Sequence, residues 1–358
     1  MKKLITGFIA LLILFAACQP AGEQKTANSG DDTEKRVEEL LAKMTLDEKI
    51  GQMNQYTSRW EMTGPAPANA DSMFIYNMIK EGKLGSMLNV TGVAATRKVQ
   101  KLAVDSSRLG IPLILGYDVI HGYKTIFPIP LAEAASWDPE IAKLSAKVAA
   151  DESAAAGLHW TFAPMVDVSR DARWGRVMEG SGEDAYLGSK MAYARVKGFQ
   201  GEDLSAENTI AACVKHFAAY GFAEAGRDYN TVDVSEELLQ NVIFPPFKAS
   251  VEAGAATFMN SFNTLNGIPA TGNIYLQRDI LKGEWNFDGF VVSDWGSIGE
   301  MINHGFAADR KDAALKAIIA GSDMDMEANA YIEDLKGLVE AGLRSEERRV
   351  GKECRSRW

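Results

Sequence analysis

A repeated pattern constrains this chain most: a short, continuous apolar run that ends at a charged or aromatic residue. Residues 290–295 read FVVSDW, so this run ends at Asp294 and Trp295. The pattern recurs at residues 113–118, 210–216 and 320–325. Parallel strands buried on both faces are continuous apolar runs, and in a (β/α) barrel their carboxyl ends line the active site. The sequence therefore predicts one site built from several strand ends.

Strand candidates alternate with helical patterns along most of the 358 residues. Such alternation is typical of βαβ units and a parallel sheet, and a TIM-type (β/α)8 barrel takes about 250 residues. We expect this α/β barrel, with an eighth strand in residues 51–56 or else an irregular or incomplete barrel. The other strand candidates are residues 83–89, 113–118, 159–168, 209–216, 256–262, 290–294 and 321–326.

Capping residues mark several helix boundaries. Thr45 and Glu48 have the spacing of a capping box, and Asp138 followed by Pro139 is a typical helix start. Residues 236–253 have the pattern of one helix. The barrel domain is expected to cover residues 33–344.

Residues 1–18 have the composition of an export signal. A basic start precedes an apolar stretch too short to span a bilayer, and two alanines before Cys18 resemble a bacterial lipoprotein cleavage site. We expect lipid attachment at Cys18, a polar linker over residues 19–32, and a location in the periplasm or at the outer membrane, with membrane contact only through this anchor. A simple cleaved signal peptide is the alternative.

Charge and cysteine content argue against several functions. The formal net charge is −10, and it becomes −12 without the two lysines of the export signal. An acidic chain is a poor candidate for binding nucleic acid. The three cysteines form neither a disulfide framework nor a zinc-binding spacing. We predict no metal and no cofactor.

The last residues differ from the rest. Residues 345–358 hold five Lys or Arg and three Asp or Glu, without helical or strand periodicity. They resemble translated adapter sequence, so we expect a non-native tail. A solvated basic helix is the alternative.

Three strand ends carry candidate catalytic or binding residues. Asp294 beside Trp295 suits a sugar, because CH faces stack on an aromatic ring while the acid attacks the sugar or accepts from its hydroxyls. Lys215 and His216 are adjacent donors that carboxylates or ligand hydroxyls must satisfy if buried. Asp118 ends another apolar run. The alternatives are helix capping by either aspartate and a plain ion pair at Lys215 or His216.

Two charged segments lie between the strands. Residues 167–176 hold three arginines, two aspartates and a tryptophan, and we expect part of this set to form an internal ion-pair network. Residues 178–184 are glycine-rich and acidic, which predicts a structured loop with too many carboxylates for a phosphate. Their spacing does not match a calcium site.

Five segments occur in order: GYDVIHG at residues 116–122, APMVDVSRDARWGR at 163–176, VKHFAAYG at 214–221, RDYNTVDVS at 227–235 and GFVVSDWGSI at 289–298. Together they resemble glycoside hydrolase family 3, in particular its periplasmic β-glucosidase branch. The resemblance covers residues 45–342. It implies a retaining, exo-acting β-glucosidase that removes terminal non-reducing β-D-glucosyl residues from oligosaccharides through a covalent glycosyl-aspartate intermediate.

The resemblance also implies roles for single residues. It assigns the nucleophile to Asp294. Phe262 departs from the tyrosine of many relatives, so one hydrogen bond to the site is absent. The residues implied to bind or line the sugar subsites are Asp118, Arg173, Lys215, His216, Met259 and Trp295.

A retaining mechanism also needs a carboxylic acid about 5–5.5 Å from the nucleophile. Members of the resembled family usually supply it from a second α/β domain, which we expect to be absent from this chain. Poor turnover of ordinary glycosides is the expected consequence. The alternatives are a β-xylosidase of the same family and a non-catalytic sugar-binding lipoprotein fragment. The carboxylates available within the chain, which match no acid/base pattern, are Glu179, Glu183, Glu224 and Asp228.

Overall fold

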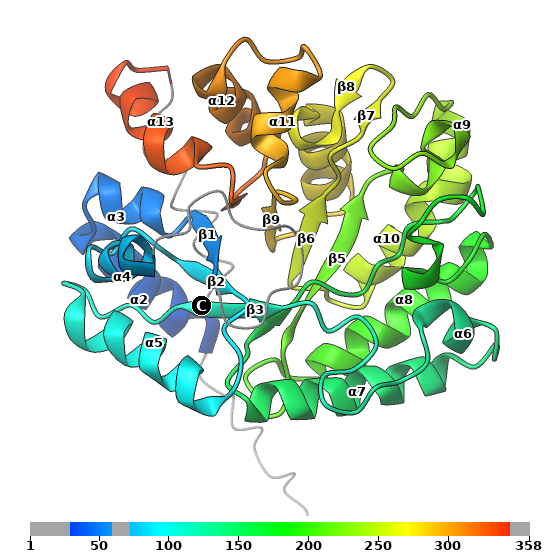
Figure 1. The fold of residues 1–358 in the computed structure, drawn as a ribbon, viewed down its shortest axis with the longest axis horizontal. Helices are drawn as coiled ribbons and strands as arrows, with labels where there is room; N and C mark the ends of the chain where they lie inside the picture. Colours follow the sequence, from blue (N-terminus) through cyan, green and yellow to red (C-terminus); the bar gives the residue numbers. More distant parts are fainter. Residues whose placement is uncertain (1–28, 59–71, 344–358) are drawn as a thin grey trace, which may run out of the picture.

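A computed structural model describes residues 29–58 and 72–343, in which eight parallel strands form a barrel inside a layer of helices (Figure 1). The strand order is β10-β1-β2-β3-β4-β5-β6-β9, and a bridge between Val292 and Met324 joins the two ends of this order. The expected TIM-type barrel is confirmed, and β1 supplies the eighth strand. The barrel strands are β1 (Asn54–Thr57), β2 (Ser86–Leu88), β3 (Ile114–Tyr117), β4 (Trp160–Thr161), β5 (Ala211–Phe217), β6 (Thr257–Asn260), β9 (Phe290–Val292) and β10 (Asp325–Met326).

Helices follow the strands and surround the barrel (Figure 1). The predicted capping box is present, because the Thr45 hydroxyl accepts the Glu48 N–H at 3.2 Å and the Glu48 carboxylate accepts the Thr45 N–H at 2.8 Å. Asp138 caps the helix that begins at Pro139. The helices are α2 (Ser29–Lys43), α3 (Leu46–Gly51), α4 (Ser72–Lys80), α5 (Val93–Ser106), α6 (Pro130–Ala134), α7 (Pro139–Ala155), α8 (Ala185–Gln200), α9 (Glu236–Leu238), α10 (Phe244–Glu252), α11 (Ser297–Asn303), α12 (Arg310–Ala320) and α13 (Ala330–Glu340).

The helical pattern predicted for residues 236–253 is confirmed, with a π-helical irregularity inside it. The structure has α9, a π-helical segment η4 (Leu239–Ile243) and then α10. Pro245 and Pro246 have no N–H to donate, so the regular α-helical ladder is interrupted before α10 and the preceding turn is wide. The two prolines occupy the first turn of α10, where a missing N–H does least harm.

Small residues let the outer helices pack closely. Ala146 and Ala150 of α7 and Ala192 of α8 are buried in the main apolar core together with β5. A Cβ at Gly198 of α8 would lie 2.5 Å from the Lys143 carbonyl oxygen of α7, so only glycine fits there. These contacts hold the helices against the barrel and so fix the strands whose carboxyl ends form the site.

Several predicted features lie outside the described residues: the export signal with Cys18, most of the linker and the tail. Residues 29–32 belong to α2 rather than to the linker. In the described ranges, no helix is both long and apolar enough to cross a membrane. A further antiparallel pair, β7 (Thr264–Leu265) and β8 (Ile268–Pro269), lies beyond β6.

Candidate active site

Side chains from four strand ends meet in one cavity of about 330 Å³. Asp118 follows β3, Lys215 and His216 end β5, Met259 lies in β6 and Asp294 follows β9. Trp295, the next residue, also lines the cavity. The structure therefore brings together six of the seven residues predicted for the sugar site.

One carboxylate oxygen of Asp294 accepts a hydrogen bond, and the other does not. Its Oδ1 accepts the N–H of Trp295 at 2.6 Å, whereas Oδ2 has no hydrogen-bond partner and lies 3.7 Å from Nε2 of His216. Burial raises the pKa of Asp294, although Arg176, the Trp295 N–H and Lys215 act in the opposite direction. The cations thus limit a pKa increase that burial causes. A fixed carboxylate with one unbonded oxygen is suited to attack a ligand carbon.

Asp167 orients His216. Its Oδ2 accepts the backbone N–H of His216 at 2.8 Å and lies 2.9 Å from the ring Nδ1. Burial, with the nearby charges of Arg176 and Lys215, lowers the pKa of His216, so the imidazole is neutral. A neutral ring that donates from Nδ1 to Asp167 presents Nε2 as an acceptor on the side of Asp294.

Lys215 and Asp118 form a second fixed pair. Lys215 Nζ donates to Asp118 Oδ1 at 3.2 Å, and the Lys215 side chain is only 5% exposed. A buried ammonium needs such a partner. The pair places a cationic donor and a carboxylate acceptor side by side in the cavity, an arrangement that suits neighbouring hydroxyl groups.

The structure does not bring Arg173 into this group. Its side chain is 72% exposed and pairs with Asp171 at 2.6 Å. Arg176, three residues later, lines the cavity instead and binds Glu179 through Nε at 2.7 Å and Nη2 at 2.9 Å. The expected ion-pair network in residues 167–176 therefore exists in part.

Two aromatic side chains form one wall of the cavity, and sequence reasoning assigned no role to one of them, Tyr229. Tyr229 stacks on Phe262 with ring centroids 3.8 Å apart, and both line the cavity. Asp228 anchors this region by accepting from Trp174 Nε1 at 3.0 Å and from the Tyr220 hydroxyl. Only the recurrence of aromatic residues around residues 217–229 could have indicated this wall.

The other carboxylates near the site differ in their surroundings. Glu179 lines the cavity in its bidentate pair with Arg176, while Glu183 and Glu224 do not line it. Burial and then the charge of Asp294 raise the pKa of Glu300 to about 7, and its Oε2 has no hydrogen-bond partner. Among the described residues, no cluster of His, Cys, Asp and Glu is arranged to hold a metal ion.

The geometry defines what the cavity can bind. It offers an ammonium, a guanidinium, a neutral imidazole and several carboxylates beside the rings of Trp295, Tyr229 and Phe262. Such a mixture fits a small, hydroxyl-rich ligand with apolar ring faces.

The model of the glycosyl hydrolase family 3 N-terminal domain matches residues 45–355. The chain belongs to glycosyl hydrolase family 3. It is 45% identical over 306 residues to a periplasmic beta-glucosidase of Salmonella typhimurium and 36% identical over 338 residues to a beta-xylosidase of Formosa agariphila, which corresponds to 86% and 93% of this chain. Among solved structures, it resembles beta-glucosidase from Listeria innocua in complex with isofagomine, with a TM-score of 0.83, 44% identity and 90% of this chain covered.

The chain spans less than half the length of these family members. It covers 39% of the Salmonella protein, 42% of the Formosa protein and 45% of the Listeria chain. The Listeria enzyme has also been solved in complex with glucose and, as a mutant, with laminaribiose.

Proposed function

We propose that this chain carries the nucleophile and the terminal glucose subsite of a retaining, exo-acting β-glucosidase. The supporting observation is the unbonded Oδ2 of Asp294, buried at a strand end beside Lys215 and His216. Substrates are oligosaccharides that end in a non-reducing β-D-glucosyl residue, in line with the laminaribiose and glucose complexes of the Listeria enzyme.

In the proposed reaction, Oδ2 of Asp294 attacks the anomeric carbon as the bond to the leaving oxygen breaks, and a glycosyl-aspartate forms. Asp118, Lys215, His216 and Arg176 hold the sugar hydroxyls. These hydrogen bonds strengthen as positive charge develops on the sugar ring. They therefore lower the free energy of the bound transition state relative to that of the bound substrate. Water then cleaves the intermediate with retention of configuration.

We also propose that the acid/base is not among the described residues. Glu179 and Asp118 line the cavity, but each is paired with a cation, Arg176 and Lys215 respectively. A carboxylate held in this way is a poor proton donor. Glu300, whose pKa burial raises to about 7, does not line the cavity. The described carboxylates are therefore expected to serve only substrates whose leaving group needs no proton.

The decisive test compares 2,4-dinitrophenyl β-glucoside with methyl β-glucoside, each with wild type and Asp294→Ala. Hydrolysis of the first substrate alone, reduced about 1,000-fold in the variant, is the expected outcome. Hydrolysis of both substrates would contradict the proposal for the acid. If neither is cleaved and a 2-fluoroglucoside does not label Asp294 while glucose binds saturably, the chain is a sugar-binding module and the enzyme proposal fails.

A β-xylosidase is the second candidate, because the Formosa relative carries that name. The two activities differ in whether the subsite accepts the exocyclic CH₂OH of glucose. We expect kcat/KM for dinitrophenyl β-glucoside to exceed that for the β-xyloside by about tenfold or more. The reverse ratio would favour the xylosidase.

For location, we propose export to the periplasm with a lipid anchor on Cys18. The signal-like composition of residues 1–18 and the name of the Salmonella relative support this. Expression in a Gram-negative host should give a membrane-bound protein that incorporates labelled palmitate, and Cys18→Ala should release it. A soluble, unlabelled wild-type protein would contradict the anchor.

A further inference from the structure

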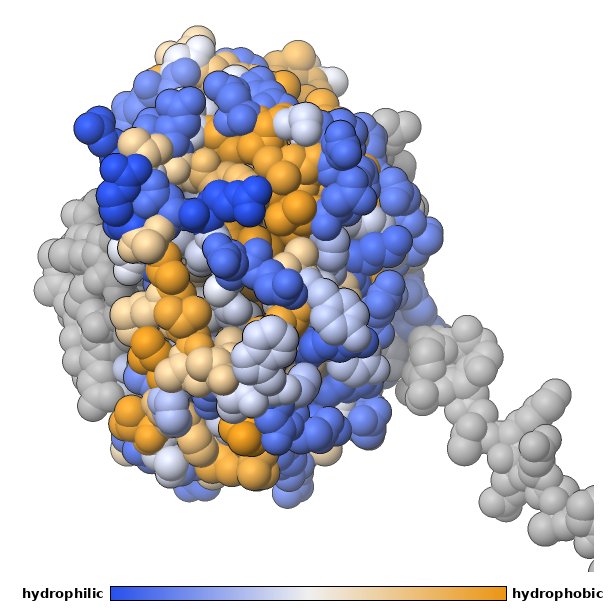
Figure 2. All heavy atoms as spheres, turned by 90° about the vertical axis from the view of Figure 1, so that its right-hand side faces the viewer, coloured by the Kyte–Doolittle hydropathy of each residue, from blue (hydrophilic) through white to orange (hydrophobic). Residues whose placement is uncertain are grey.

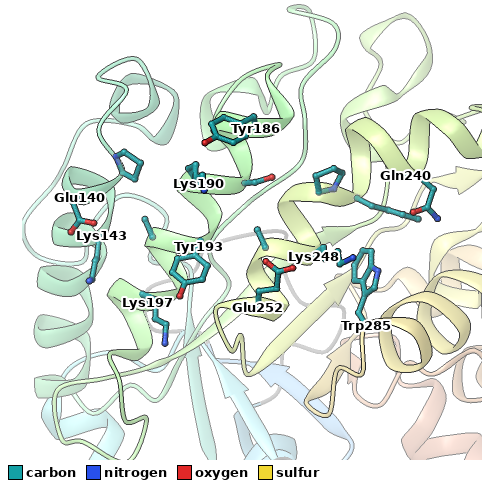
Figure 3. A pocket seen from close by; sticks show the side chains of 16 residues that line it. Glu140, Lys143, Tyr186, Lys190, Tyr193, Lys197, Gln240, Lys248, Glu252 and Trp285 are labelled. Carbon is teal, nitrogen blue, oxygen red and sulfur yellow. The ribbon is translucent and has the colours of Figure 1, made fainter.

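A second and larger hollow of about 730 Å³ lies on the outer side of the barrel, between α7, α8 and α10 (Figure 3). None of its lining residues lines the strand-end cavity. Its floor includes the buried rings of Phe244 and Trp285. Figure 2 shows the side of the molecule that lies at the right in Figure 1, where apolar and hydrophilic residues are interspersed. We call the hollow the helix groove.

Aromatic and cationic residues alternate along one wall of the helix groove. Tyr186, Lys190, Tyr193 and Lys197 follow one another along α8 with spacings that keep them on one helix face (Figure 3). Tyr186 is 73% exposed and Tyr193 is 43% exposed. At 1.5 Å per residue the two tyrosines are about 10 Å apart along the helix axis, roughly the length of two linked pyranose rings.

The helix groove concentrates positive charge in an acidic protein. Four lysines line the groove: Lys143 of α7, Lys248 of α10 and the two lysines of α8. Two glutamates line it as well, so the groove lining is net positive, whereas the whole chain has a net charge of −10. Lys197 pairs with Glu202 at 3.3 Å. Within the described ranges, Lys143, Lys190 and Lys248 form no ion pair. Lys190 lies 5.2 Å from the centroid of the Tyr186 ring.

We propose that the helix groove binds an acidic oligosaccharide, one that carries carboxylate or sulfate groups, as a site separate from the strand-end cavity. The lysines match the anionic groups, and the exposed tyrosine rings provide flat faces for the CH faces of sugar rings. Glu140, Glu252 and Gln240 also line the groove and accept hydrogen bonds from hydroxyl groups. An acidic peptide could pair with the lysines, but it has no sugar CH faces to stack on the exposed tyrosine rings. This proposal does not rest on the proposed function.

Titration calorimetry of the full chain at low salt tests it with four probes: an oligogalacturonate hexamer, a sulfated hexasaccharide, neutral maltohexaose, which has no β-glucosyl end, and oligoglutamate. We expect binding of at least one acidic sugar, and the two acidic probes show whether carboxylate or sulfate is preferred. Lys190→Glu with Lys248→Glu should weaken that binding by about tenfold or more, and Tyr193→Ala by about fivefold.

The matched control is Lys98→Glu with Lys311→Glu, which makes the same charge change at exposed positions outside the groove. It should change the affinity by less than about twofold. The proposal is overturned if neither acidic sugar binds, if the control weakens binding as much as the groove variant, or if maltohexaose binds equally well. Equal binding of oligoglutamate that is insensitive to Tyr193→Ala would also overturn it. Circular dichroism checks that each variant is folded.

Discussion

Asp167 determines which tautomer of the His216 ring faces the cavity. Both its hydrogen bonds to His216 come through Oδ2, and neither residue is more than 3% exposed. Burial raises the pKa of Asp167 to about 7 and lowers that of His216. The imidazole is therefore neutral, and its tautomer depends on what Asp167 offers to Nδ1.

Replacing Asp167 with Leu should release that tautomer. Asn would keep its amide oxygen toward the backbone N–H and Nδ1 of His216, but Leu offers no acceptor there, so the ring proton can move to Nε2 and the ring then donates toward Asp294 instead of accepting a ligand hydroxyl. We expect kcat/KM for dinitrophenyl β-glucoside to fall about 10–100-fold. Nitrogen-15 NMR of the imidazole reports the tautomer directly, and a loss of activity with an unchanged tautomer would argue against this role. Ser169→Ala, a buried hydroxyl without a bond in the structure, is the control.

At the scale of elements, Asp325 joins strand β10 to helix α13. Its carboxylate accepts the N–H groups of Ala328 at 3.0 Å, Ala330 at 2.8 Å and Tyr331 at 3.0 Å. The residue also pairs with Asn54 of β1, where the sheet order β10-β1 begins. One residue thus holds the start of a helix through its side chain and a closing strand of the barrel through its backbone.

Asp325→Ala should lower the free energy of unfolding by about 3 kcal/mol, because two buried N–H groups and one partly buried N–H group lose their acceptor. Asp309 caps α12 through a single bond to the Asp312 N–H, so Asp309→Ala should lower it by only about 1 kcal/mol. Urea unfolding of both variants measures the difference. Equal losses would mean that the buried cap contributes no more than an exposed one.

At the scale of the whole molecule, buried acids determine how stability responds to pH. Burial raises the pKa of Glu300 and Glu327 to about 7 and that of Asp325 to about 6. Folding raises the pKa of each of these acids. Such an acid contributes its full stabilisation of the folded state at a pH below its pKa in the unfolded chain, and this contribution is lost as the pH rises through its pKa in the folded protein. His159 and His216, with lowered pKa values, act in the opposite direction, but mainly below pH 6.5.

We therefore expect the free energy of unfolding to fall by about 1 kcal/mol between pH 6.5 and pH 8. Glu300→Gln should be more stable than wild type by about 1 kcal/mol at pH 8, after allowance for partial exposure, and should match wild type at pH 5. Its Oε2 has no hydrogen bond to lose. Glu207→Gln, at an exposed loop position, should show no such difference. Stability that rises with pH across this range would refute the prediction.

The sequence by itself determined the barrel and most of its strand-end residues. An apolar run such as FVV must be buried on both faces, and Asp118, Lys215 and Asp294 stand where such runs end. Parallel strands in one barrel place all their carboxyl ends on one side. Local pattern and topology were therefore sufficient to bring these side chains together.

Only the tertiary structure decided which loop residues enter the site. Arg173 and Arg176 are only three residues apart in one segment, yet Arg173 pairs with Asp171 outside the cavity and Arg176 pairs with Glu179 inside it. Tyr229 lines the cavity by stacking on Phe262, which is distant in sequence. The course of a loop depends on contacts between segments far apart in the chain, and these contacts leave no periodic signal in the sequence.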